Sequence, residues 1–256
     1  MSVRTQRETE SIAETDETVV FEVFRYIPEE DDEPHFENYE IDWEDGMTVL
    51  DGLMEIRDRI DSSLTVRHSC RMARCGSDAL YINGTQRLGC NTQIQDLETR
   101  PVKVEPLPHF DVVRDLVVDM DGFYDRMDEV EPWFQPDHEP EEGREYLQDP
   151  ENRENIDTVL DCIWCGACTS SCTPAGVDDD FPGPAAMAKA YRFYKDEREG
   201  SEARQKRLEM LESAHKLYRC HTQFNCTEVC PKGISPTKAI MEMSKESAKQ
   251  KLRFWD

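Results

Sequence analysis

Residues 162–172, C-I-W-C-G-A-C-T-S-S-C, space four cysteines as C-x2-C-x2-C-x3-C. This is the run of a bacterial two-cluster ferredoxin, in which the fourth cysteine ligates the other cluster. A second run, C-H-T-Q-F-N-C-T-E-V-C-P at residues 220–231, has three cysteines, and Gln223 stands where a symmetric ferredoxin has its middle cysteine. The two runs indicate a chain that carries electrons.

The crossover rule divides these cysteines into two ligand sets. Four thiolates suit a [4Fe–4S] cluster: Cys162, Cys165, Cys168 and Cys230. Three thiolates suit a [3Fe–4S] cluster, a cube that lacks one corner: Cys172, Cys220 and Cys226. Gln223 is then expected beside the corner that lacks iron, where filling space is the simplest role for its side chain.

A third site is predicted from the three remaining cysteines. The plant-type [2Fe–2S] pattern is C-x4-C-x2-C followed by a distal cysteine. Cys70 and Cys75 satisfy the x4 step, Cys90 is the distal ligand, and the x2 step falls on Asp78. A carboxylate is a hard anionic donor that can replace a thiolate on ferric iron. The alternative role for Asp78 is to cap backbone N–H groups of the loop.

Disulfide bonds and zinc binding account less well for the ten cysteines. The N-terminus has no apolar core of the kind a signal peptide needs, so a disulfide framework in a secreted protein is not favoured. A reducing compartment with thiols committed to metal fits better. Zinc is the competing metal, but successive x2 spacings with a crossover ligand suit cubane clusters better than its paired-cysteine sites.

The chain is strongly acidic, with 55 Asp and Glu against 30 Lys and Arg and a formal net charge of −25. Such a surface repels phosphate backbones, which excludes nucleic acid as a partner. An ordinary solvated surface explains the acidity most simply. The spread of acidic residues, with Arg outnumbering Lys, also favours a halophilic source, in which salt screens the self-repulsion.

Residue patterns predict an α+β unit over residues 18–106. Two extended stretches come first, followed by a helix that Thr48 caps and a hairpin at Asn83-Gly84. The apolar positions of that helix recur at helical spacing and are Val49, Leu53, Ile56 and Ile60. Residues 1–17 are polar and acidic and are predicted to be disordered.

The rest of the chain is predicted to be a connector and a helical unit. Residues 107–145 form the connector, with a helix around 112–127. Residues 146–256 form the helical unit, with helices that begin at Pro184, span 201–218 and begin at Ser235-Pro236. No stretch approaches the roughly 18 apolar residues that span a bilayer.

The whole arrangement resembles the iron–sulfur subunit of succinate dehydrogenase (respiratory complex II) and of its sibling fumarate reductase. The resemblance rests on S-C-R-x-x-x-C-G-S-D at 69–78, R-D-L-V-V-D-M at 114–120, A-Y-R-F at 190–193, the first cysteine run, and R-C-H-T-x-x-N-C-x-x-x-C-P-K-G from 219. It implies a plant-ferredoxin-like β-grasp domain that holds [2Fe–2S]. An all-α ferredoxin-like domain then holds [4Fe–4S] and [3Fe–4S].

In this family the subunit connects an FAD-binding flavoprotein, which oxidises succinate, to membrane anchor subunits where quinone is reduced, with or without haem b. The resemblance therefore places the chain on the cytoplasmic face of the cell membrane, attached through its partners. It makes His221 a candidate for contact with quinone or an anchor haem, with a structural hydrogen bond as the alternative. Gln223 can likewise hydrogen-bond a quinone. The stretch after Cys172 lacks the tryptophan that many members carry, which leaves the shape of the quinone site open.

Two other functional classes remain open: a soluble multi-cluster ferredoxin, and a binding module that uses metal only for folding. The R-D-L-V-V-D-M segment and the [2Fe–2S] unit argue against a free carrier. No G-x-G-x-x-G opens a helix after a strand, so the chain is expected to bind no dinucleotide and to have no substrate-converting site of its own. The direction of the reaction, succinate oxidation or fumarate reduction, is not decided by these residues.

Overall fold

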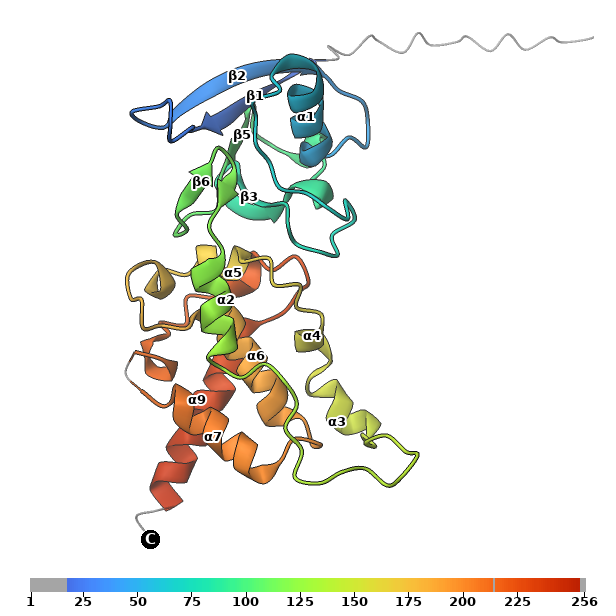
Figure 1. The fold of residues 1–256 in the computed structure, drawn as a ribbon, viewed down its shortest axis with the longest axis vertical. Helices are drawn as coiled ribbons and strands as arrows, with labels where there is room; N and C mark the ends of the chain where they lie inside the picture. Colours follow the sequence, from blue (N-terminus) through green and yellow to red (C-terminus); the bar gives the residue numbers. More distant parts are fainter. Residues whose placement is uncertain (1–17, 214, 254–256) are drawn as a thin grey trace, which may run out of the picture.

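The computed structural model describes residues 18–213 and 215–253, so the segment 1–17, predicted to be disordered, lies outside the described residues. The molecule is elongated, with a sheet-based unit at one end and a helical unit at the other (Figure 1). From residue 121 to residue 253, the described part of the chain contains helices and loops but no strand. This arrangement agrees with the α+β first unit and helical second unit predicted from sequence.

The first unit is a five-stranded sheet of order β2-β1-β5-β3-β4, in which β1 and β5 are parallel and the other neighbours antiparallel. Its strands are β1 (Thr18–Arg25), β2 (His35–Asp42), β3 (Ala79–Ile82), β4 (Thr85–Leu88) and β5 (Val102–Glu105). The predicted turn at Asn83-Gly84 joins β3 to β4, with both residues at positive φ. Two 3₁₀ turns, η2 (Gly89–Asn91) and η3 (Ile94–Asp96), separate β4 from β5.

Helix α1 (Val49–Glu55) covers one face of this sheet. Thr48 caps it as predicted: its hydroxyl accepts from Asp51 N–H at 3.2 Å, and the Asp51 carboxylate accepts from Thr48 N–H at 3.0 Å. Gly52 faces the sheet so closely that a Cβ there would meet the Phe21 ring and lie 3.2 Å from the Ile41 side chain. Close packing of this helix on the sheet therefore requires the glycine.

The helical spacing predicted through Ile60 does not extend past Ile56. After Ile56 the chain continues as a π-helical turn, η1 (Ile56–Ile60), closed by a bond of 2.8 Å from Asp61 N–H to Ile56 O. The wider turn breaks the 3.6-residue period, so Ile60 is 54% exposed while Ile56 is fully buried.

The prediction of a helix around 112–127 was wrong in its first half. Residues there form a short antiparallel hairpin, β6 (Val112–Arg114) and β7 (Val117–Val118), and only α2 (Asp121–Asp128) is helical. The reason is the buried carboxylate of Asp115, which accepts from Arg25 Nε at 3.0 Å, Tyr26 N–H at 3.0 Å and Thr65 N–H at 2.8 Å. These tertiary bonds hold the hairpin against the sheet unit.

The described part of the second unit consists of four short helices and three longer ones. Its helices are α3 (Pro150–Glu154), α4 (Asp157–Leu160), α5 (Ala167–Ser170), α6 (Gly183–Lys195), α7 (Ser201–Leu211), α8 (Asn225–Glu228) and α9 (Pro236–Arg253), with 3₁₀ turns η4 (Pro174–Gly176) and η5 (Leu217–Arg219). Helix α6 is central and contacts α2, α4, α5, α7 and α9. Its small and apolar side chains are buried, which lets the neighbouring helices approach closely.

Two predicted helix starts agree with the structure, and one predicted helix is too long. Pro184 lies in the first turn of α6, and α9 begins at Pro236. The helix predicted for 201–218 ends at Leu211, and the next helical segment among the described residues is the 3₁₀ turn η5. There Leu217 enters the core with 2% of its surface exposed, so tertiary packing ends the helix early.

The expected connector, residues 107–145, is folded onto both units over its first half. Leu116 N–H donates to Thr65 O at 3.3 Å on the sheet side, while Phe123 and Met127 of α2 are buried and α2 packs on α6. Within the described residues, no helix combines the length and apolar character needed to cross a bilayer.

Candidate iron–sulfur sites

The two cysteine runs fold into loops with the same backbone conformation. In the first, Trp164 and Gly166 have φ angles of 57° and 80°, two and four residues after the leading cysteine. In the second, Thr222 and Phe224 have φ angles of 57° and 66° at the same two offsets. A short helix follows each loop directly, α5 in the first case and α8 in the second. The two loops are therefore equivalent position by position.

This equivalence gives Gln223 the loop position that Cys165 holds in the first run. The Gln223 amide oxygen accepts from the Thr173 hydroxyl at 3.2 Å, so the side chain bridges to the loop that follows the first cysteine run. His221 and Gln223 lie at the rim of the cavity that Cys172, Cys220 and Cys226 line. Both side chains are exposed, and neither is buried in the protein core.

Four cysteines line one cavity in the helical unit, and they are Cys162, Cys165, Cys168 and Cys230. The rest of its lining is mainly apolar and includes Ile163, Ala185, Ala188 and Ile234. Cys230 comes from the second run and reaches the cavity of the first, as the crossover arrangement requires.

A second cavity is lined by the three other cysteines of the two runs, Cys172, Cys220 and Cys226. Here Cys172 comes from the first run, so each run contributes one cysteine to the other cavity. His221, Gln223 and Phe224 also line this cavity, together with Pro174, Phe181 and Ile240.

Burial raises the pKa of five of these thiols, those of Cys162, Cys165, Cys168, Cys172 and Cys226. Burial, with the neighbouring cysteines, raises the pKa of the Cys165 thiol to about 12 and the pKa of Cys168 well above its ordinary value. Burial likewise raises the pKa of Cys172 to about 11. Clustered buried thiols of this kind are suited to iron, whose positive charge stabilises thiolates.

In the sheet unit, the loop between η1 and β3 wraps its backbone N–H groups around sulfur. Cys70 Sγ accepts from the N–H of Arg74 at 3.3 Å and of Cys75 at 3.2 Å, and Cys90 Sγ accepts from Ala73 N–H at 3.3 Å. Burial alone would raise the pKa of Cys75, but its bonds with the Ser77 hydroxyl and nearby N–H groups lower that pKa to about 7. Cys70, Cys75 and Cys90 thus meet at this loop, although Cys90 comes from η2. Backbone N–H groups of the loop stabilise negative charge on sulfur.

Asp78 lies inside the same loop, with 2% of its surface exposed. Its Oδ2 atom accepts from Cys90 N–H at 2.5 Å, so it caps a backbone donor, the alternative role considered from sequence. The carboxylate also contacts the Cys90 thiol. Burial is the largest cause that raises the pKa of this thiol to about 12, and the hydrogen bond with Asp78 is the second. A buried carboxylate directly against a cysteine of the site is compatible with ligation as well as capping.

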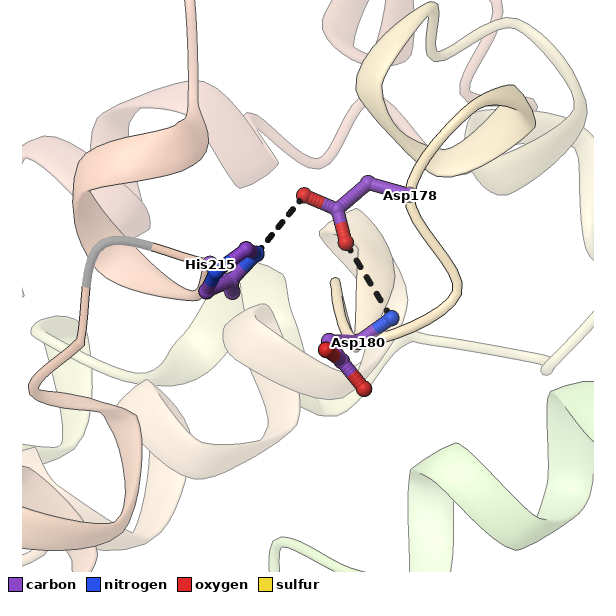
Figure 2. Close-up of side chains that lie close together, drawn as sticks. All are labelled: Asp178, Asp180 and His215. Atoms are coloured by element: carbon purple, nitrogen blue, oxygen red, sulfur yellow. Dashed lines mark hydrogen bonds and ion pairs between the residues drawn. The ribbon is translucent and has the colours of Figure 1, made fainter.

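One further group of potential metal ligands gave no signal in the sequence. Figure 2 shows Asp178 between His215 and Asp180: its carboxylate lies 3.2 Å from His215 Nδ1 and accepts from Asp180 N–H at 3.2 Å. The guanidinium of Arg219 lies 2.9 Å from the same Asp178 oxygen as His215, and its positive charge opposes a cation there. The group is better described as a brace between the loop after Cys172 and the segment before Cys220.

Comparisons with known proteins support the division into two units. Residues 20–125 match the family "2Fe-2S iron-sulfur cluster binding domain", and residues 158–234 match the family "4Fe-4S dicluster domain". The first match contains all residues of the loop around Cys75, and the second contains both cavities' cysteines.

Whole-chain comparisons extend this similarity. The chain is 39% identical over 231 residues to the mitochondrial succinate dehydrogenase [ubiquinone] iron-sulfur subunit of Candida glabrata, covering 89% of this chain and 90% of that protein. The Mycobacterium smegmatis Sdh1 complex in the apo form contains a chain 28% identical with a TM-score of 0.82, covering 92% of this chain and 97% of that one. A hypothetical protein from Helicobacter pylori, 16% identical with a TM-score of 0.51, matches 89% of this chain and 39% of that one and shares the fold alone.

The matched domains, the cysteine-lined cavities and the similarity along nine tenths of the chain agree with one another. The chain carries iron–sulfur clusters and transfers electrons as one subunit of complex II, an enzyme complex, rather than acting as a free ferredoxin. It belongs to the family of succinate dehydrogenase iron–sulfur subunits.

Proposed function

We propose that this subunit passes electrons from a flavoprotein that oxidises succinate to quinone at a membrane anchor, through three clusters in series. The observation that carries the proposal is the division of the cysteines of the two runs between two cavities, each run lending one cysteine to the other's cavity. This is the division expected of a two-cluster ferredoxin unit in which one loop offers one thiolate fewer.

The proposed ligands follow from this geometry. Cys162, Cys165, Cys168 and Cys230 hold [4Fe–4S], and Cys172, Cys220 and Cys226 hold [3Fe–4S]. Cys70, Cys75, Cys90 and Asp78 hold [2Fe–2S] in the sheet unit. The donor chemistry fits in each case, since cysteine thiols and one buried carboxylate are donors that ferric iron accepts.

The order of the three sites along the molecule supports a relay. Gly76, next to Cys75, packs directly against Cys165 of the four-cysteine cavity. Cys168 of that cavity is close enough to Cys226 of the three-cysteine cavity for their charges to interact, and α5 contacts α8. The four-cysteine site therefore lies between the other two.

Each cluster, when bound, accepts and releases one electron at a time. The chain's own residues hold the sites in place and control their surroundings. Apolar side chains such as Ile163, Ala188 and Ile234 line the middle cavity and keep water from it. Backbone N–H groups directed at Cys70 and Cys90 sulfur stabilise negative charge at the first site, which favours the reduced state.

We place quinone at the rim of the three-cysteine cavity, where His221 and Gln223 are exposed. Both side chains offer hydrogen-bonding groups, and the Gln223 amide nitrogen is left to donate when its oxygen accepts from Thr173. The same rim is where an anchor subunit, with or without haem b, would cover the exposed residues.

Three coarser features of the chain complete the proposal. Residues 18–106 and 146–256 hold their own clusters and residues 107–145 join them. The chain works on the cytoplasmic face of the cell membrane, attached through its partner subunits. The excess of acidic over basic residues, 55 to 30, supports a source with a salt-rich cytoplasm such as a halophilic archaeon, where salt screens the repulsion.

Purification of the membrane complex, followed by iron and sulfide analysis and paramagnetic resonance at graded potentials, tests the proposal. We expect a flavoprotein partner and three signals: one from an oxidised three-iron cluster and two from reduced two-iron and four-iron clusters. Cys75→Ala, Cys168→Ala and Cys226→Ala should each remove a different signal. Loss of the same signal in two of these variants would overturn the ligand sets.

A further inference from the structure

Gly76 brings the cysteine loop of the sheet unit into direct contact with the helical unit. It is buried, although its neighbour Cys75 is exposed, and its φ angle is +72°. A Cβ built on Gly76 would lie 2.6 Å from Cys165 Cβ, 3.0 Å from Cys165 Cα and 3.2 Å from Ile163 O. These atoms of Cys165 and Ile163 belong to the backbone or are bonded directly to it. No side-chain rotation can therefore make room for a Cβ at Gly76.

The next residue of the Cys165 loop is also closely packed. A Cβ built on Gly166 would lie 3.1 Å from the Met120 side chain and 3.3 Å from the Phe110 ring. Gly166 itself has a φ angle of 80° and leads into α5. The loop that carries Cys165 therefore contacts the segment 107–120 as well as Gly76, and a shift of the loop would disturb both contacts.

The contact gives a short route between two proposed clusters. Gly76 is bonded to Cys75, a proposed ligand of the two-iron site, and touches Cys165, a proposed ligand of the four-iron site. Only one gap between non-bonded atoms separates the two ligand residues. The rate of electron tunnelling falls steeply when electrons must cross a gap between non-bonded atoms. A route with a single tight contact is therefore favoured.

We propose that electrons cross between the two units at the Gly76–Cys165 contact, and that Gly76 is a positioning residue which sets the separation of the two clusters. In this step the reduced two-iron cluster loses one electron and the oxidised four-iron cluster gains it, with no proton moved and no bond broken. The inference rests on the proposed ligand sets. It adds that a glycine is required here for the approach of the two units as well as for the φ angle.

Gly76→Ala tests this role in the assembled complex, and the chain offers a matched control. Alanine at Gly76 brings both backbone strain at positive φ and the clash with Cys165. Gly46 has a φ angle of +86° in the same unit and nothing within 4 Å of a built Cβ, so Gly46→Ala brings the strain without a clash. Gly76→Asn keeps the clash and reduces the strain, because asparagine tolerates left-handed backbone.

The decisive readout is the magnetic interaction between the two reduced clusters, measured as the faster spin relaxation of the two-iron signal when the four-iron cluster is reduced. We expect both Gly76 variants to weaken this enhancement and to slow reoxidation of the two-iron cluster by the four-iron cluster, while Gly46→Ala behaves like wild type. Cluster content and midpoint potentials should stay unchanged, which separates a change in distance from a change in the clusters.

Three results would overturn the inference: a wild-type enhancement in both Gly76 variants with their clusters intact, an equal loss in Gly46→Ala, or loss of the clusters from both Gly76 variants while Gly46→Ala keeps them. The third result would mean that Gly76 acts in building the sites rather than in setting their separation. A wrong proposed function would appear differently, as wild-type complex that lacks one of the three cluster signals.

Discussion

At the scale of single residues, Gln223 determines how many thiolates the second loop can offer. The loops of the two runs share their backbone conformation, and Gln223 stands at the position of Cys165. The backbone is thus already arranged for a fourth ligand, and only the side chain differs. A change of one residue is therefore expected to change the type of cluster.

Gln223→Cys should permit a fourth iron in the cavity of Cys172, Cys220 and Cys226. An oxidised three-iron cluster has an odd number of ferric ions and gives a paramagnetic signal, which should vanish in this variant. Cluster type helps to set potential, so the midpoint of this site should also shift. Gln223→Ala, which adds no thiolate, should keep the signal. Full retention of the signal in iron-replete Gln223→Cys would show that the ligand set is wrong.

Two roles are considered for Asp78: ligation of iron, and acceptance of the hydrogen bond from Cys90 N–H. Substitutions can separate the two. Asn keeps an acceptor for Cys90 N–H but lacks the anionic charge, whereas Cys supplies a thiolate. If Asp78 ligates iron, Asp78→Cys should keep the cluster with a shifted potential, while Asp78→Asn and Asp78→Ala should lose or labilise it. Potentiometric titration with paramagnetic resonance measures both. Normal cluster content and potential in Asp78→Asn would mean that the carboxylate only caps the loop.

At the scale of elements, a buried cation joins β1, β2, the end of η1 and the β6–β7 hairpin. The Arg25 side chain is 4% exposed and pairs with Glu37, Asp61 and Asp115. Such a group is stable inside the protein only while its carboxylate partners are charged. The docking of the hairpin, which positions the segment 107–120 against Gly166, depends on this network.

The pH dependence of stability should reveal this network at Asp61. Burial alone would raise the pKa of Asp61, but bonds from Ser63, Arg25 and Tyr39 lower it below the ordinary value of 3.8. A lowered folded-state pKa means that the stabilisation is complete above the unfolded value and is lost as pH falls through the folded value. Asp61→Asn should therefore cost about 1.5–3 kcal/mol at pH 7. The cost should begin to fall below about pH 4, where the unfolded-state carboxyl is protonated, and should continue to fall as pH approaches the folded-state pKa.

Denaturant unfolding of the cluster-loaded protein at several pH values measures this difference between wild type and variant. Asp58→Asn is the control, because Asp58 is 56% exposed and, among the described residues, pairs with its neighbour Arg57. Its effect should be within about 0.5 kcal/mol at every pH. A cost of Asp61→Asn that does not begin to fall once the pH is below about 4 would contradict the role assigned to the charge.

At the scale of the whole molecule, the three proposed sites follow one another along an elongated chain. The sheet unit and the helical unit lie at opposite ends (Figure 1). The four-cysteine cavity lies close to their contact, because Gly76 packs against Cys165. A serial arrangement makes each site necessary for passage through the subunit. It also means that the chain needs partners at both ends to supply and remove electrons.

The isolated subunit should therefore be brown and redox-active but inert toward succinate with artificial acceptors. Within the complex, Cys168→Ala should abolish quinone reduction by succinate, because the middle site is lost, and should leave succinate–dye activity at the flavoprotein at least partly intact. Paired assays with quinone and dye measure the two activities. Succinate oxidation by the pure, flavin-free subunit, or quinone reduction unaffected by Cys168→Ala, would contradict a serial relay.

The sequence by itself determined the family, the two-unit organisation and the proposed assignment of cysteines to sites. Cluster loops make this possible because a few residues of fixed spacing set the conformation of each loop, and that spacing is visible in the chain. Local signals were similarly sufficient for the Thr48 cap and the Asn83-Gly84 turn. Each depends on residues at most a few positions apart.

Only the tertiary structure decided the features that join distant segments. Asp115 holds residues 112–118 as a hairpin through bonds to β1 and Thr65, where the apolar pattern alone favours a helix. The π-helical turn exposes Ile60, and the approach of Gly76 to Cys165 brings the two units together. These outcomes depend on shape and charge matched across the fold, which no local pattern of residues records.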